Sequence, residues 1–272
     1  MRFRGLLIIL ALTAVLFSTG SVFAGQAVNP AVQSILPKIK MSGTFHTPVK
    51  GLYGAVIPNG QIIYVFPKDK IILLGQMWTA AGKNLTQEAR LKMQQSKVKK
   101  IERGIDLKKA IKAGDGPIKV IEFANIDCPF CRVAEKFFSR PEIAKKVTRY
   151  IFLIPQPSIH PHSTAMTLYY FTKSDGEPLS YRLSLLNKIM VGHIYQTKFG
   201  NVAPKIKVSK KAVRRLSYDT ELANEYSIFG VPFFIINGKA VDGINIGLIL
   251  QDLGVKGVNV AKLNHELFGR QP

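Results

Sequence analysis

Cysteine is scarce in this chain: 272 residues contain only two, Cys128 and Cys131, within a single Cys-x-x-Cys motif. Two cysteines cannot form a structural disulfide framework and also carry out redox chemistry. A structural zinc site commonly needs two such pairs, or one pair with suitably spaced histidines. The chain has no second pair, and among its five histidines only His160 and His162 lie close together. We therefore expect neither a metal site nor a cofactor.

Acidic residues are also few, with 17 Asp and Glu against 38 Lys and Arg, a formal net charge of +21. Such a balance favours acidic partners, nucleic acid or anionic membrane surfaces. The basic residues are spread over 92–112, 136–146 and 205–215 and form no nucleic-acid-binding motif. We interpret the charge as a solvated basic surface and expect no nucleic-acid partner.

A hydrophobic run long enough to cross a membrane is missing as well. The apolar segment Leu6–Phe17 has about 12 residues, and a bilayer requires roughly 20. Arg2 and Arg4 precede it, and residues 22–24 end in the small side chain that signal peptidase prefers. Residues 1–24 are therefore predicted to be a signal peptide, with a retained membrane anchor as the alternative. Cleavage would leave an exported, periplasmic protein in an oxidising compartment, where disulfides persist.

The segment after the predicted signal peptide changes from irregular to β. Residues 25–42 contain two prolines and are predicted to be a poorly ordered lead-in. Three strands are predicted at 52–57, 62–66 and 71–77, and Asn59-Gly60 between the first two is a strong hairpin signal. A meander of this size is rarely stable alone. We therefore predict that residues 25–82 form a small β-rich, cystatin-like dimerisation domain.

A polar helix is predicted next, within a linker at residues 83–113. Asn84 is suited to cap it, with Gln87 completing a capping box. A narrow apolar stripe follows at helical spacing, and the opposite face is basic; the stripe comprises Leu91, Val98, Ile101 and Ile105. Gly104 marks a predicted break or hinge. A helix this polar between two β-containing segments is typical of an inter-domain connector.

Residues 114–272 alternate between strand and helix patterns. A strand at 118–124, a helix from the cysteines to about 140 and a strand at 150–154 predict a β-α-β unit. Further helices are predicted at 160–173, 178–190, 209–226, 246–253 and 260–268, and strands at 233–236 and 240–241 around an Asn237-Gly238 turn. Residues 132–230 are far more than a direct connection needs. The prediction is therefore a mixed α/β, thioredoxin-like domain with a helical insertion at about 157–226.

The strand, turn and Cys-x-x-Cys opening a helix predict a redox-active pair that forms a Cys128-Cys131 disulfide. At the helix start, unpaired N–H groups and the helix dipole stabilise a Cys128 thiolate, the attacking species in disulfide exchange. Cys131, one turn later, is placed to resolve a mixed disulfide. Pro129 suits the first helical position, and Phe130 offers an uncharged apolar contact. Catalysis is therefore assigned to Cys128 and Cys131.

Two supporting features lie outside the motif. Glu122 falls in the middle of an apolar strand, where burial should raise its pKa and suit it to carry protons for Cys131. Its alternative role is at the sheet end or toward solvent. Val231 and Pro232 precede another apolar strand, and a cis bond there would place the Val231 backbone beside the cysteines to pair with a substrate. The alternative is an ordinary trans proline.

These residues together resemble a known family, the exported homodimeric disulfide isomerases of the DsbC and DsbG type. The resemblance covers nearly all of the chain beyond the signal peptide and rests on residues from both halves: 47–53, Tyr64-Val65, Gly75, 84–86, Glu122-Phe123, 128–131 and 230–232. It implies a V-shaped dimer whose thioredoxin-like domains face an apolar cleft. It also implies a nucleophilic Cys128, a resolving Cys131 and a cis Pro232.

The function that the resemblance implies is that of a protein disulfide isomerase and reductase that also binds unfolded chains. Its partners would be misfolded or reduced exported proteins and a membrane thiol reductase. Two residues depart from the DsbC pattern: Val231 replaces the usual Thr, and Pro129 replaces Gly. They leave open a dimeric DsbA-like oxidase, or a bifunctional protein, served by a membrane oxidase. A holdase chaperone or assembly factor is the alternative of another class.

Overall fold

The computed structural model describes residues 27–57, 60–191, 207–228 and 230–269. The predicted signal peptide, the Asn59 half of the first turn and residues 192–206 of the predicted insertion lie outside these ranges. Within them, no helix combines the length and apolarity needed to span a membrane.

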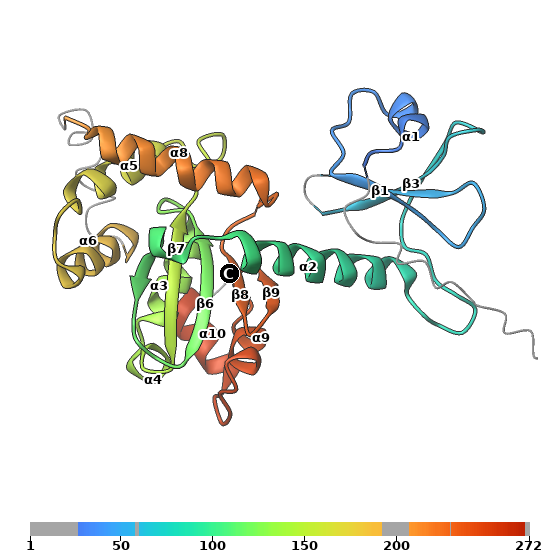
Figure 1. Cartoon of the computed structure of the whole chain (residues 1–272). Coiled ribbons are helices and arrows are strands. Elements are labelled where there is room, and N and C mark those ends of the chain that lie inside the picture. Colours follow the sequence, from blue (N-terminus) through green and yellow to red (C-terminus); the bar gives the residue numbers. More distant parts are fainter. Residues whose placement is uncertain (1–26, 58–59, 192–206, 229, 270–272) are drawn as a thin grey trace, which may run out of the picture.

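The N-terminal part is a four-stranded antiparallel sheet in the order β1-β2-β3-β4 (Figure 1). Its strands are β1 (Gly43–His46), β2 (Tyr53–Val56), β3 (Ile62–Phe66) and β4 (Ile71–Leu74), preceded by α1 (Pro30–Ile35). Val32 of α1 is fully buried against Ala55 and Val65 of the sheet. One helix and one sheet thus share a small core, in agreement with the predicted β-rich domain.

Two elements here differ from the sequence-based expectation. Residues 25–42 were expected to be a poorly ordered lead-in, but they contain α1. Pro30 occupies the first helical turn, where its missing N–H costs no hydrogen bond, and the Asn29 side chain caps the helix by accepting from the Ala31 N–H at 2.9 Å. Strand β1 is a fourth strand where three were predicted, and its four residues are too few to show a clear alternation.

The long helix α2 (Leu85–Gly104) connects the two parts of the molecule (Figure 1). The Asn84 side chain accepts from the Gln87 N–H at 2.9 Å, which confirms the predicted cap. Near its start Ala89 packs into the N-terminal core, and toward its end Val98 and Ile101 pack into the C-terminal core. Leu91, predicted to lie in the same apolar stripe, is instead 47% exposed, because the helix is buried only at its two ends.

The C-terminal part is built on a five-stranded mixed sheet in the order β5-β7-β6-β8-β9. Its strands are β5 (Ile111–Ala113), β6 (Ile118–Ala124), β7 (Val147–Leu153), β8 (Phe233–Ile236) and β9 (Lys239–Asp242). β6 and β7 are parallel, and the other neighbours are antiparallel. This is the predicted thioredoxin-like arrangement. Strand β5 was missed, so the sheet begins before residue 114, where the domain was expected to start.

Helices cover both faces of this sheet (Figure 1). They are α3 (Pro129–Phe138), α4 (Pro141–Ala144), α5 (Ser163–Lys173), α6 (Leu179–Val191), α8 (Lys210–Glu225), α9 (Ile246–Asp252) and α10 (Val260–Phe268), with a 3-10 turn, η1 (Leu107–Lys109), before β5. The predicted insertion contributes α5, α6 and α8. Buried side chains of α5 and α6 pack in one hydrophobic cluster with both cysteines. Asn237 and Gly238 both have positive φ, 50° and 73°, as the predicted two-residue hairpin turn requires.

Candidate active site

The local sequence places Cys128 at the start of a helix. Buried strand β6 ends at Ala124, a short turn follows, and Cys128 is the N-cap of α3 with extended backbone angles. Pro129 fills the first helical position, as predicted, and the Arg132 N–H bonds to the Cys128 carbonyl at 3.1 Å. Both cysteines are free thiols and buried. The nucleophile thus lies where unpaired helical N–H groups point.

The surroundings of Cys128 favour its thiolate. Its pKa is lowered to about 6, first by the hydrogen bond from the Cys131 thiol and then by the backbone N–H groups of Cys131 and Phe130. The charge of His160 lowers it further, while burial opposes the shift. At neutral pH Cys128 is therefore a thiolate in most molecules, and the thiolate is the form that attacks a disulfide.

Cys131 has the opposite character. It is completely buried, and burial together with the neighbouring Cys128 sulfur raises its pKa well above the usual value. The Asn125 N–H donates to its sulfur at 3.3 Å, which offsets only part of this shift. The pair is therefore asymmetric: one sulfur is ionised near neutral pH and the other holds its proton.

The loop before β8 approaches the same sulfur. The Val231-Pro232 bond is cis, as predicted, and the Val231 carbonyl oxygen lies 3.8 Å from the Cys128 sulfur. This segment comes from a part of the sequence 103 residues away. A backbone group beside the nucleophile is suited to receive an extended substrate chain.

Strands β6 and β7 and helix α3 contribute one residue each to a cluster of three charges, which we call the buried ion triad: Glu122, Arg149 and Glu135. The Arg149 guanidinium donates to Glu122 at 2.9 Å and to Glu135 at 2.7 Å, and all three side chains are at least 90% buried. Burial raises the pKa of Glu122, and Arg149 opposes that shift. The predicted rise is confirmed, and the alternative of a solvent-facing Glu122 is wrong.

Sequence reasoning missed both partners of Glu122. Arg149 lies in the middle of apolar strand β7, so its position resembles that of Glu122 in β6. Parallel pairing places Val120 opposite Arg149 and Glu122 opposite Ile151, so these side chains emerge on one face. A charged residue within an apolar segment was visible in the sequence at both positions. The strand register that brings the two charges together is known only from the structure.

Two exposed apolar side chains lie near the site residues in the sequence, and one further group that acts on the site was missed. Phe130 is 55% exposed and Ile159 is 65% exposed, beside His160 in the sequence. His160 was considered above only as a metal ligand, yet its charge acts on Cys128. The described residues contain no group of three potential metal-ligating side chains. The arrangement suits thiol chemistry on a polypeptide that presents apolar side chains.

Comparison with known protein families finds a match for the N-terminal part of the chain. Residues 22–87 match the family of the disulfide bond isomerase protein N-terminal domain. This match confirms the resemblance to DsbC-type proteins in that part of the sequence. A search of curated proteins gives no match.

Several solved structures resemble part of the chain at low identity. A disulfide interchange protein from Neisseria gonorrhoeae shares 24% identity, with 55% of this chain and 96% of that chain covered and a TM-score of 0.41. A linker-deleted ScsC from Proteus mirabilis shares 18% identity over 65% of this chain and 86% of its own, with a TM-score of 0.46. The thiol-disulfide exchange protein alpha-DsbA2 from Wolbachia pipientis shares 14% sequence identity, with 61% of this chain and 97% of that chain covered and a TM-score of 0.47. These likenesses are too weak to assign an activity.

Proposed function

The chain joins a disulfide bond isomerase N-terminal domain to a thioredoxin-like domain with an asymmetric dithiol, and from this combination we propose that it isomerises disulfides in exported proteins. More broadly, the family match and the fold support a thiol–disulfide oxidoreductase. The observation that carries the proposal is the match of residues 22–87 to the disulfide bond isomerase N-terminal domain, in a chain whose other part places Cys128 at a helix start beside a fully buried Cys131.

In the proposed reaction the Cys128 thiolate attacks one sulfur of a wrong substrate disulfide. That S–S bond breaks, a mixed disulfide forms, and the other substrate cysteine leaves as a thiolate. A substrate thiolate then attacks the substrate sulfur of the mixed disulfide. A new substrate disulfide forms, the Cys128 thiolate is released, and no net electrons are transferred.

Cys131 can resolve a mixed disulfide that no substrate thiolate has attacked, and so release the substrate. After losing its proton it attacks the Cys128 sulfur, which gives a Cys128-Cys131 disulfide and a substrate reduced by two electrons. The raised pKa of Cys131 slows this step at neutral pH, so a substrate thiolate has time to act first. We propose that Glu122 accepts that proton, because its own pKa is raised and its charge acts on Cys131.

The same low pKa supports the reverse direction as a second candidate. A sulfur with a low pKa is a good leaving group, so a Cys128-Cys131 disulfide would readily oxidise a substrate dithiol. Val231 also favours the oxidase, because it provides no hydroxyl beside the sulfurs, whereas proteins of the DsbC type have Thr at this position. A dimeric oxidase, or a bifunctional protein, is therefore the alternative within the same chemistry.

The exposed apolar side chains support binding of unfolded polypeptide. Phe130 borders the nucleophile and Ile159 follows strand β7, and both are more than half exposed. Apolar rims of this kind favour segments that a folded protein would bury. We therefore include chaperone-like binding in the proposed function; a pure holdase or assembly factor would work without Cys128.

We propose that two chains join through the N-terminal sheet. β4 is an edge strand, and its four residues, Ile71 to Leu74, are each between 43% and 75% exposed. Apolar edges of this kind are usually covered by another chain. The signal-like N-terminus supports a periplasmic location, where the partners would be misfolded exported proteins and a membrane thiol reductase, or an oxidase for the alternative.

The experiment that tests the proposal compares two assays on the full exported chain. Reduced protein is added to a substrate with scrambled disulfides, and oxidised protein is added to the same substrate fully reduced. An isomerase restores native pairing faster in the first assay than it introduces disulfides in the second. The opposite ranking would establish the oxidase.

A further inference from the structure

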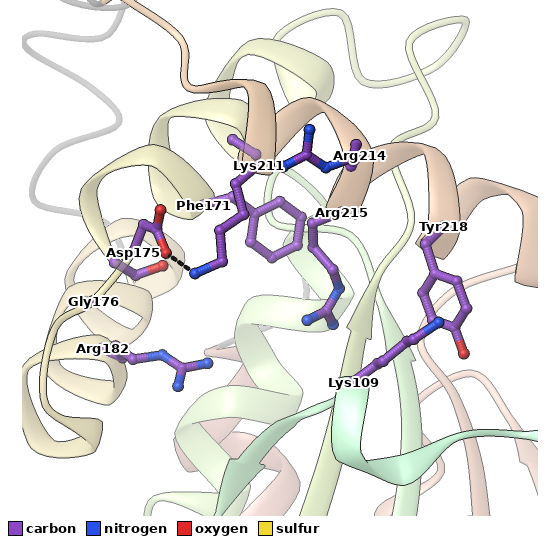
Figure 2. A pocket seen from close by; sticks show the side chains of 11 residues that line it. Lys109, Phe171, Asp175, Gly176, Arg182, Lys211, Arg214, Arg215 and Tyr218 are labelled. Atoms are coloured by element: carbon purple, nitrogen blue, oxygen red, sulfur yellow. Dashed lines mark hydrogen bonds and ion pairs between the residues drawn. The ribbon is translucent and has the colours of Figure 1, made fainter.

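A cavity lies beside the helical insertion, and neither cysteine belongs to its lining. It has a volume of about 450 Å³ and lies between η1, the end of α5, the start of α6, and α8 (Figure 2). Cavities of this size hold small organic ligands. Nothing in the proposed disulfide chemistry uses it.

Its lining is strongly cationic. Figure 2 shows the ends of Arg182, Lys211 and Arg215 directed toward a common space in front of the Phe171 ring. Lys109 and Arg214 also belong to the lining, and Asp175 is the one acidic side chain among the described residues that form it. Cations drawn from separate helices repel one another, so their convergence favours an anion between them.

Arg215 is held in place before any ligand arrives. Its Nε donates to Asp219 at 2.8 Å, and its guanidinium carbon lies 5.1 Å from the centre of the Phe171 ring. Asp219 is fully buried and also accepts from the Leu153 N–H at 3.0 Å, which fixes it to the end of β7. A pre-positioned guanidinium loses little entropy on binding.

Of the other cations, Lys109, Lys211 and Arg214 are exposed and Arg182 is half-buried. Lys211 pairs with Asp175, but its side chain is 69% exposed, and exposed pairs contribute little stability. An incoming anion can therefore replace this carboxylate at small cost. Arg182 of α6 and Arg215 of α8 both line the cavity, with their guanidinium ends directed into it (Figure 2).

From this geometry we propose that the cavity binds a phosphate group, with Arg182, Lys211 and Arg215 as its ligands. A phosphate offers three or more anionic oxygens in different directions, whereas a carboxylate offers two in one plane. Forked guanidinium groups and a lysine ammonium from two helices match the former arrangement. The Phe171 and Tyr218 rings provide apolar walls for the organic part of a phosphate ester.

Two sources share this chemistry: a soluble phosphate ester or the headgroup of an anionic phospholipid. Pyrophosphate is the probe for the first, measured by titration calorimetry at low and moderate salt. Vesicles with and without phosphatidylglycerol are the probe for the second, measured by co-sedimentation. Both use the full exported chain, because the cavity combines residues from η1, α5, α6 and α8.

The test variant is Arg182→Gln with Lys211→Gln, and the matched control is Lys188→Gln with Lys210→Gln. Each pair removes two positive charges from α6 and α8, but Lys188 and Lys210 lie outside the described lining. Arg215 is left intact, because its loss would leave buried Asp219 without its ion-pair partner. Disulfide activity of both variants should equal that of the wild type, which shows that they fold.

We expect the wild type and the control to bind at least one probe, and the cavity variant to bind it at least about tenfold more weakly, given the strength of charge-assisted hydrogen bonds. Loss confined to pyrophosphate indicates a soluble ester, and loss confined to anionic vesicles indicates a lipid headgroup. No binding of either probe by the wild type would overturn the proposal. Equal binding by the cavity variant and the control would also overturn it, because bulk positive charge would then be responsible.

Discussion

Cys128 is buried, yet its surroundings stabilise a negative charge on its sulfur. Its thiolate is supported chiefly by one neighbour, the Cys131 thiol, and next by backbone N–H groups at the start of α3. A helix start alone would give a smaller shift. The chemistry of the site therefore depends on the two sulfurs acting as a unit.

This arrangement predicts how alkylation of the reduced protein varies with pH. Below a pH of about 6 Cys128 is a neutral thiol, and above it a thiolate, so the rate with iodoacetamide should rise through that midpoint and then level off. In Cys131→Ala the midpoint should move upward, because the main hydrogen bond is lost. Cys128→Ala serves as the unreactive control. A wild-type midpoint near 9 would contradict the assigned environment.

The buried ion triad predicts a large effect of removing its one cation. Arg149→Met leaves Glu122 and Glu135 facing each other without compensation, and breaking a buried ion pair in this way costs about 3–5 kcal/mol. The measurement is the free energy of unfolding in urea. As the carboxylates protonate, the loss should shrink, so the deficit should be smaller at pH 5 than at pH 7.

Arg140→Met is the matched control for this prediction. Arg140 also bridges two glutamates, Glu142 and Glu266, at 2.7 and 3.0 Å, but on the protein surface. Solvent screens such pairs, so its removal should change stability much less. Similar losses in the two variants would show that burial of the triad has no special energetic consequence.

Among the secondary-structure elements, edge strand β4 is the one through which we expect two chains to associate. Ile72→Lys adds a charge to the exposed apolar edge and should convert a dimer into a monomer at micromolar concentration. Light scattering of the purified chain measures the mass. Val49→Lys is the control, since Val49 is 46% exposed in the same part of the chain but lies outside β4. A monomeric wild type, or a dimeric Ile72→Lys, would exclude this interface.

The elements also show what the sequence could predict. Strand β6 and helix α10 were predicted with their observed bounds, because apolar spacing and caps mark them locally. Helix α1, strand β1 and strand β5 were missed. Each has six residues or fewer, and each is stabilised by packing or pairing with distant segments rather than by its own pattern.

At the scale of the whole molecule, α2 joins a sheet suited to self-association to a domain suited to thiol chemistry (Figure 1). The sequence predicted this order of parts, together with the cysteines and the cis Pro232, because each leaves a local signature. It did not predict the buried ion triad or the cationic cavity. Their members come from separate strands and helices, so only the folded chain brings them together.

If Cys128 rearranges wrong disulfides without net transfer of electrons, reduced protein should restore native activity to a substrate with scrambled disulfides when no oxidant is added. The wild type should do so catalytically, and Cys128→Ala should not. Equal recovery with Cys128→Ala, or no recovery above the uncatalysed rate with the wild type, would contradict this expectation.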